Sequence, residues 1–311
     1  MNHHLLPPLA LALATGFLLP IPLARGHWAH HAPRLAICVW ALLGALFTAG
    51  LALSVLQALL PYRTSHRLSH LTEECLPWSA ERCRPPGPSM LSSLAVIDYV
   101  AVGATVATIM LPCAAFLREI VRARRQRAGH AELLSLLGKR NQGLRATVLE
   151  HSTPAVYCLP GRAPQVIVST GALSTLTECQ LNAAVEHERA HIAGRHHLMT
   201  LAVQAFAAAF PRLPLAGGMR REVPLLLEMA ADDRALRRCS RETLALALYA
   251  MAAGQAPAAA LAMGGPSAVL RVRRLLTPRQ VGHAVLQGLF ATTAVIAGAT
   301  PLILACCSIP G

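Results

Sequence analysis

The sequence contains few charged and few aromatic residues for its length. Asp, Glu, Lys and Arg make up 14% of the 311 residues, whereas hydrophobic residues make up 54%. Soluble domains carry roughly 25% charged residues, so this shortage argues against an ordinary soluble protein and indicates a membrane protein. The net charge is +13, but only 4% of the residues are aromatic. Because the arginines do not alternate with aromatic side chains that could stack on bases, we expect contact with anionic lipid and no direct nucleic-acid partner.

The cysteines form no disulfide framework. Nine of them are scattered along the chain, and none is spaced as Cys-x-x-Cys. This pattern excludes a disulfide-rich fold and a structural zinc module built on cysteine pairs. Cys75 and Cys83 share one polar loop. They can pair if that loop faces an oxidising compartment, and two unpaired thiols are the other interpretation.

Four apolar runs are long enough to cross a bilayer, whose hydrocarbon core requires about 20 apolar residues. They are 5–24, 35–60, 91–117 and 284–307. The first run contains four prolines and lies at the N-terminus, where a cleaved signal peptide is the alternative. No lysine or arginine precedes it and no convincing small-x-small cleavage site follows, so we expect a retained helix.

Arginines beside these runs predict how the chain crosses the membrane. Five lie within 118–127, directly after the third run, and four lie within 271–279, directly before the fourth. The positive-inside rule makes both ends of the intervening region cytoplasmic, with the N-terminus, the loop 61–90 and the C-terminus outside. That loop also carries four arginines, which weakens the signal. We predict a multi-pass protein of the inner (cytoplasmic) cell membrane, with a membrane region at 1–117, a cytoplasmic domain at 118–283, and a fourth transmembrane helix with a short tail at 284–311.

The region between the third and fourth runs is long enough for a domain. Segments 155–159 and 165–169 are rich in β-formers and flank a turn, which predicts a hairpin. The apolar segment 198–216 contains two prolines, which favour a buried or interfacial helix over a fifth span. Further helices are predicted at 118–140, 177–194, 222–239 and 241–253. The predicted fold class is therefore mainly α, with four transmembrane helices and a cytoplasmic α+β domain.

The segment His187-Glu188-Arg189-Ala190-His191 carries the clearest chemical signal. Two histidines four residues apart project from one face of a helix and can bind the same metal ion. Glu188 can then act as general base on a metal-bound water, whose pKa zinc lowers to about 7. Two solvated histidines on a surface helix are the alternative interpretation.

A catalytic zinc site needs a third protein ligand, and two residues compete for that role. Glu228 begins the sequence Glu228-Met-Ala-Ala-Asp232 on a later predicted helix, where Asp232 can accept a hydrogen bond from a ligand histidine. His197 satisfies the metzincin spacing, but such enzymes also need a methionine turn, and the sequence offers only a poor candidate for it. We favour Glu228 and predict that the metal ligands are His187, His191 and Glu228.

These motifs resemble those of the membrane metallopeptidases of the BlaR/MecR type, which are relatives of the CAAX-protease-like gluzincins. The resemblance rests on the HExxH segment, on Gly194-Arg-His-His197, on Glu228-Met-Ala-Ala-Asp-Asp233 and on Cys158-Leu-Pro-Gly161. It implies a gluzincin-type domain with one catalytic Zn²⁺ bound by the three predicted ligands, Glu188 as the general base, and Asp232 behind a ligand histidine. It also implies that strand 165–169 is an edge strand that binds the substrate backbone.

The resemblance further implies a zinc-dependent endopeptidase that cleaves a regulatory protein or peptide at the inner membrane surface. A transcriptional repressor is one candidate substrate. The family's β-lactam receptors carry a penicillin-binding sensor domain after the last span, and we expect none here, so a signal would act through the outer segments or a partner. A non-enzymatic, zinc-stabilised signal transducer is the alternative function. Glu188 argues against it, because a structural zinc site has no use for a base.

Overall fold

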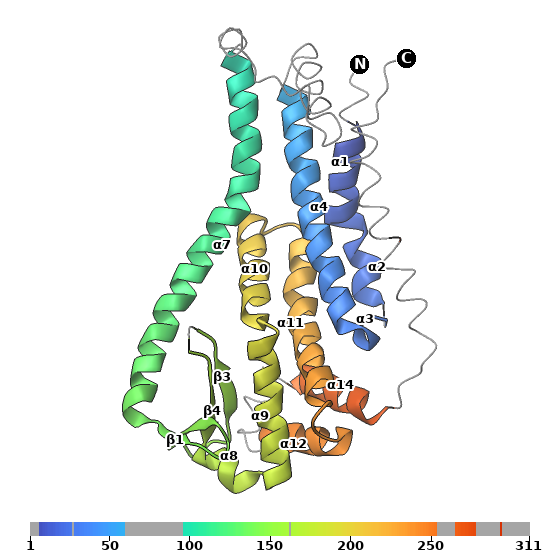
Figure 1. Cartoon of the computed structure of the whole chain (residues 1–311). Coiled ribbons are helices and arrows are strands. Elements are labelled where there is room, and N and C mark those ends of the chain that lie inside the picture. Colours follow the sequence, from blue (N-terminus) through green and yellow to red (C-terminus); the bar gives the residue numbers. More distant parts are fainter. Residues whose placement is uncertain are drawn as a thin grey trace, which may run out of the picture.

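The structure, a computed structural model, describes residues 6–26, 28–59, 96–161, 163–253, 265–277 and 293. Within these residues the chain is mainly helical and contains one small sheet (Figure 1). The predicted fourth span, apart from Thr293, lies outside the described residues, as does the loop that carries Cys75 and Cys83.

Three described helices are long and apolar enough to cross a membrane: Leu6–Arg25, Pro33–Leu59 and Tyr99–Leu137. They correspond to the first three predicted spans. The elements that form them are α1 (Leu6–Leu13), the π-helical η1 (Ala14–Leu18), α2 (Pro20–Arg25), α4 (Pro33–Leu59) and α7 (Val96–Leu137), with the short α3 (Trp28–His31) between α2 and α4. Only 6% of the apolar window in α7 is buried, so its exposed apolar side chains suit contact with lipid. These helices are consistent with a membrane protein.

The sheet corrects one sequence-based expectation. Its strands are β1 (Lys139–Asn141), β2 (Ala146–Leu149), β3 (Val156–Leu159) and β4 (Gln165–Ser169), in the order β1-β2-β4-β3. The predicted hairpin is present, since β3 and β4 pair antiparallel. The expectation that β4 is an edge strand is wrong, because β2 pairs in parallel along its other side. The edge strand beside the helices is β3, which packs against α9.

Six further helices follow the strands in the described part of the chain. They are α8 (Thr170–Thr175), α9 (Glu178–Ala193), α10 (His196–Ala209), α11 (Pro214–Ala235), α12 (Arg241–Ala253) and α14 (Gly265–Leu276). The predicted helix 118–140 is the lower part of α7, although it ends at Leu137 and its last residues enter β1. The predicted helix 222–239 begins earlier, at Pro214, whose fixed φ angle suits the first turn.

The segment 198–216 is not one continuous helix, because it covers most of α10, the turn that follows it and the first three residues of α11. At 14 residues, α10 is about 21 Å long, shorter than the roughly 30 Å hydrocarbon core. The turn that joins α10 to α11 packs on the second candidate span, where the ring of Phe210 lies 5.2 Å from that of Phe47. Farther along α11, Gly218 leaves room for Trp40, because a Cβ there would lie 2.6 Å from the indole. Figure 1 shows α10 and α11 side by side between α7 and α4, so α11, which carries Glu228, shares a core with the membrane region.

Candidate metal centre

Helix α9 places the two histidines of the HExxH segment. Thr177 caps the helix by accepting a hydrogen bond from the backbone of Gln180, whose side chain in turn accepts from the backbone of Thr177. This capping box fixes the start of the helix. His187 is buried and His191 is half-buried, and their Nε2 atoms lie 3.1 Å apart. The two imidazoles therefore converge on one point, as the i, i+4 spacing predicts.

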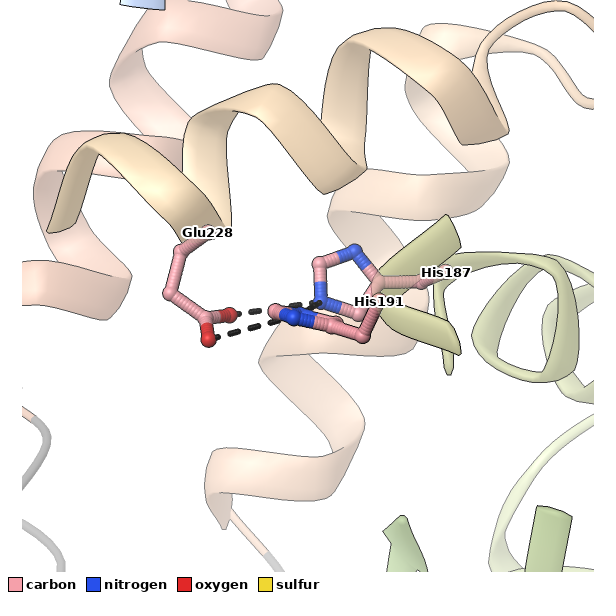
Figure 2. Close-up of side chains that lie close together, drawn as sticks. All are labelled: His187, His191 and Glu228. Carbon is pink, nitrogen blue, oxygen red and sulfur yellow. Dashed lines mark hydrogen bonds and ion pairs between the residues drawn. The ribbon is translucent and has the colours of Figure 1, made fainter. Parts of the chain in front are cut away.

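Glu228 approaches these histidines from α11 (Figure 2). Its Oε2 lies 3.2 Å from Nε2 of His187, and its Oε1 lies 3.4 Å from Nε2 of His191. One ligand atom from each residue lies within 4.8 Å of the others, and among the described residues these three form the group that can hold a metal ion. Tetrahedral zinc with bonds of about 2.0–2.1 Å separates its ligand atoms by roughly 3.3–3.4 Å. The two nitrogens and the carboxylate thus fit zinc in both chemistry and spacing.

Asp232 lies one turn beyond Glu228 and is fully buried. Its Oδ1 is 3.0 Å from Nδ1 of His187, the nitrogen that faces away from Glu228. Burial alone would raise the pKa of this carboxyl, but hydrogen bonds with Arg271 and His187 lower it from its usual value. The ionised carboxylate therefore lies close to the His187 ring, and its role in orienting that ring stays a prediction.

Arg271 of α14 also contacts these acidic residues, which the sequence did not predict. It donates hydrogen bonds of 2.9 and 2.7 Å to the two oxygens of Asp232, and its Nη1 lies 2.9 Å from Oε2 of Glu228. Burial would raise the pKa of Glu228, but hydrogen bonds with His187 and His191 and the charge of Arg271 lower it well below its usual range. The sequence suggested a contact between this arginine and lipid headgroups, whereas the structure buries it against the metal-binding residues, with its Nη2 3.3 Å from Nε2 of His187.

We expect Arg271→Ala to destabilise the fold by about 3–5 kcal/mol, because Asp232 would remain as a buried charge without its main partner. Arg273→Ala is the matched control, since Arg273 lies on the same helix and is exposed. Thermal unfolding of the detergent-solubilised proteins measures both effects. Equal melting temperatures for the two variants would show that the buried pair contributes nothing to stability.

Arg274 extends this network to the membrane region. It donates two hydrogen bonds to Asp233, of 2.7 and 2.8 Å, and a third, of 2.6 Å, to the backbone carbonyl of His30 in α3. One turn of α14 thus contacts the residues behind the metal-binding group and the connection between the first two candidate spans. The adjacent residues Asp232 and Asp233 thus pair with Arg271 and Arg274, which are three positions apart on α14. This pairing depends on how the two helices pack, so the sequence alone does not show it.

His196 is a second residue that the sequence interpretation undervalued. No role was assigned to it from the sequence, but its Nδ1 lies 2.9 Å from Nδ1 of His191. Gly194 makes this contact possible, because a Cβ there would lie 2.3 Å from Nε2 of His196. Burial and the neighbouring His191 lower the pKa of His196 to about 4, so its neutral ring can accept a hydrogen bond from the Nδ1–H of His191. Each of the two α9 histidines therefore has its own supporting side chain.

We expect His196→Ala to weaken zinc affinity about 10–100-fold, because a ligand histidine loses the partner that orients its ring. Competition with a chromogenic chelator on the purified protein measures the affinity. His151→Ala, at an exposed position away from the metal-binding group, is the control. Unchanged affinity in His196→Ala would mean that the contact with His191 is incidental.

Glu188 lies beside the three metal-binding residues without joining them, and its neighbour is Cys158 on β3. Burial raises the pKa of the Cys158 thiol to about 12, with further contributions from the charge and a hydrogen bond of Glu188. Cys158 also lines a cleft of about 420 Å³ that reaches His191 and Glu228. His197 lines this cleft as well, but within the described chain it is not part of the metal-binding group.

This arrangement of two histidines and a glutamate from neighbouring helices is typical of a metallopeptidase centre. Residues 121–223, about a third of the chain, match the model of peptidase family M48. That family includes BlaR/MecR-type and related zinc metallopeptidases and is typically zinc-dependent. The match indicates a metallopeptidase, contains the HExxH segment and ends before Glu228. Comparison with curated proteins and with solved structures gave no match.

Proposed function

We propose that this protein is a membrane-embedded zinc endopeptidase of the gluzincin type. The observation that carries the proposal is the convergence of His187, His191 and Glu228, with Glu188 beside them, in a chain whose HExxH region matches a peptidase family. The three side chains would hold one catalytic Zn²⁺.

Each residue around the centre has a proposed chemical role. The bound zinc would activate water and polarise the peptide carbonyl. Glu188 accepts the proton of the attacking water and passes it to the leaving amine. Asp232 and His196 hold the rings of His187 and His191 in position through their Nδ1 atoms. Arg271 balances the charge of the two buried carboxylates without lining the cleft, so it positions these groups and does not touch the substrate.

The proposed substrate path follows β3. Among the described strands, β3 pairs with β4 on one side only, which leaves the polar backbone groups of its other edge available for an added strand. Cys158 places that strand next to both Glu188 and the cleft. A peptide bound along β3 would therefore pass close to the metal-binding residues.

Packing of the α10–α11 hairpin on α4 supports a substrate reached at the membrane surface. We propose the cytoplasmic side of the inner membrane as that surface, with a regulatory protein as substrate and a transcriptional repressor as one candidate.

To test this, the protein fragments of cells that carry the parent chain or Glu188→Gln should be compared by mass spectrometry. We expect fragments that only the parent produces. Identical fragments in both cell lines would favour the non-enzymatic signal transducer.

A further inference from the structure

Arg127 differs from the other arginines that follow the third candidate span. Arg118, Arg122, Arg124 and Arg125 are exposed, whereas Arg127 is half-buried. It lines the cleft that also reaches His191 and Glu228. Among the arginines of this basic cluster, Arg127 therefore lies on the proposed substrate path.

Arg127 has no counter-ion in the part of the chain that the structure describes. It makes no hydrogen bond or ion pair there, while the carboxylates of Glu119, Glu150 and Glu186 are paired with other cations. Its charge acts on His197, a neighbour that cannot neutralise it. Partial burial of an unpaired cation costs free energy, and an arriving anion would recover that cost.

A lipid headgroup is the less favoured anion if the membrane span ends with the third apolar run. The third apolar run ends at residue 117, and Arg127 lies ten residues farther along a continuous helix, which is about 15 Å. The headgroup layer of one leaflet is only about 5–8 Å thick. Arg118 and Arg122 lie within that reach, but Arg127 lies beyond it.

We propose that Arg127 forms a carboxylate-binding subsite of the cleft, so that preferred peptides carry a negative charge near the cleaved bond. This inference rests on the proposed peptidase function. Cys158 lines the cleft together with Arg127 and interacts electrostatically with both Arg127 and Glu188, so the subsite and the base lie near the same residue of the edge strand. A planar guanidinium suits a carboxylate because two parallel N–H groups can bind its two oxygens. The carboxylate is either an Asp or Glu side chain or the C-terminus of the peptide.

Binding to the Glu188→Gln protein tests the subsite without requiring cleavage. Two fluorescent pools of degenerate nonapeptides are compared by anisotropy, one containing Asp and Glu and the other containing Asn and Gln in their place. Each pool is made with a free and with an amidated C-terminus. We expect at least about tenfold tighter binding of the acidic pool if side chains are recognised, or of the free-acid pool if the C-terminus is recognised.

Variants of Arg127 in the same background decide whether this residue is responsible. Arg127→Gln should abolish the preference and Arg127→Glu should reverse it towards pools that contain Lys and Arg, whereas Arg125→Gln, at an exposed position on the same helix, should retain it. Equal binding of all pools, or a preference that survives in Arg127→Gln, would overturn the proposal. Weaker binding of Arg127→Gln to phosphatidylserine vesicles, with peptide binding unchanged, would assign Arg127 to the membrane and overturn it as well. Failure of the peptidase function would be seen separately, as equal cleavage by the parent and Glu188→Gln.

Discussion

Glu188→Gln is expected to lower peptide hydrolysis by about 10²–10⁴-fold while the protein keeps its zinc. Glutamine cannot accept the proton of the attacking water, but it has almost the same shape as glutamate. The metal-binding atoms come from His187, His191 and Glu228, so the substitution removes none of them. The measurement is kcat/KM on a fluorescent peptide together with the zinc content of the same preparation.

Two results would contradict this expectation in different ways. Cleavage at the parental rate would show that Glu188 is not the base. Loss of zinc along with activity would show that Glu188 helps to bind the metal. This result would be unexpected, because Glu188 is not one of the three converging residues. Glu186→Gln serves as a control, since Glu186 pairs with Arg238 and lies outside the metal-binding group.

Glu228→Ala is expected to remove most of the bound zinc, whereas His197→Ala is expected to leave it in place. Glu228 supplies the carboxylate that faces both histidines, at 3.2 and 3.4 Å from their Nε2 atoms. Without it two ligands remain, and Arg271 loses one of its carboxylate partners. His197 lines the cleft but does not converge on the ligand atoms.

Zinc content of the two purified variants, measured by mass spectrometry after dialysis, distinguishes the two types of centre. Zinc loss in His197→Ala alone would replace the gluzincin assignment by the metzincin arrangement. Comparable loss in both variants would indicate that His197 supports the metal as well as lining the cleft.

Local signals in the sequence predict the elements that carry the HExxH segment well. The helix 177–194 is present as α9, since its capping residue Thr177 and its terminal Gly194 act within a few residues of the helix. The predicted helix 241–253 coincides with α12. The predicted strands 155–159 and 165–169 are present as β3 and β4 for the same reason, because β-formers flank a turn.

Features that depend on pairing between distant residues could not be predicted. The family resemblance implied that β4 is the edge strand, and nothing in the sequence shows that β2 pairs along it. Arg271 was assigned to the membrane surface, since a basic cluster beside an apolar run is the usual sign of headgroup contact. Its pairing with Asp232, 39 positions earlier, follows from the docking of α14. The fourth span and the state of Cys75 and Cys83 stay predictions.

Removal and return of the metal is the measurement that tests the central claim most directly. The purified full-length protein is stripped with a zinc chelator, desalted, and assayed for peptide cleavage before and after titration with Zn²⁺. We predict that activity disappears with the metal and returns when about one zinc ion per chain is bound, while Glu188→Gln binds the same zinc and stays inactive. Cleavage by the zinc-free protein, or cleavage that zinc restores equally in Glu188→Gln, would contradict the account.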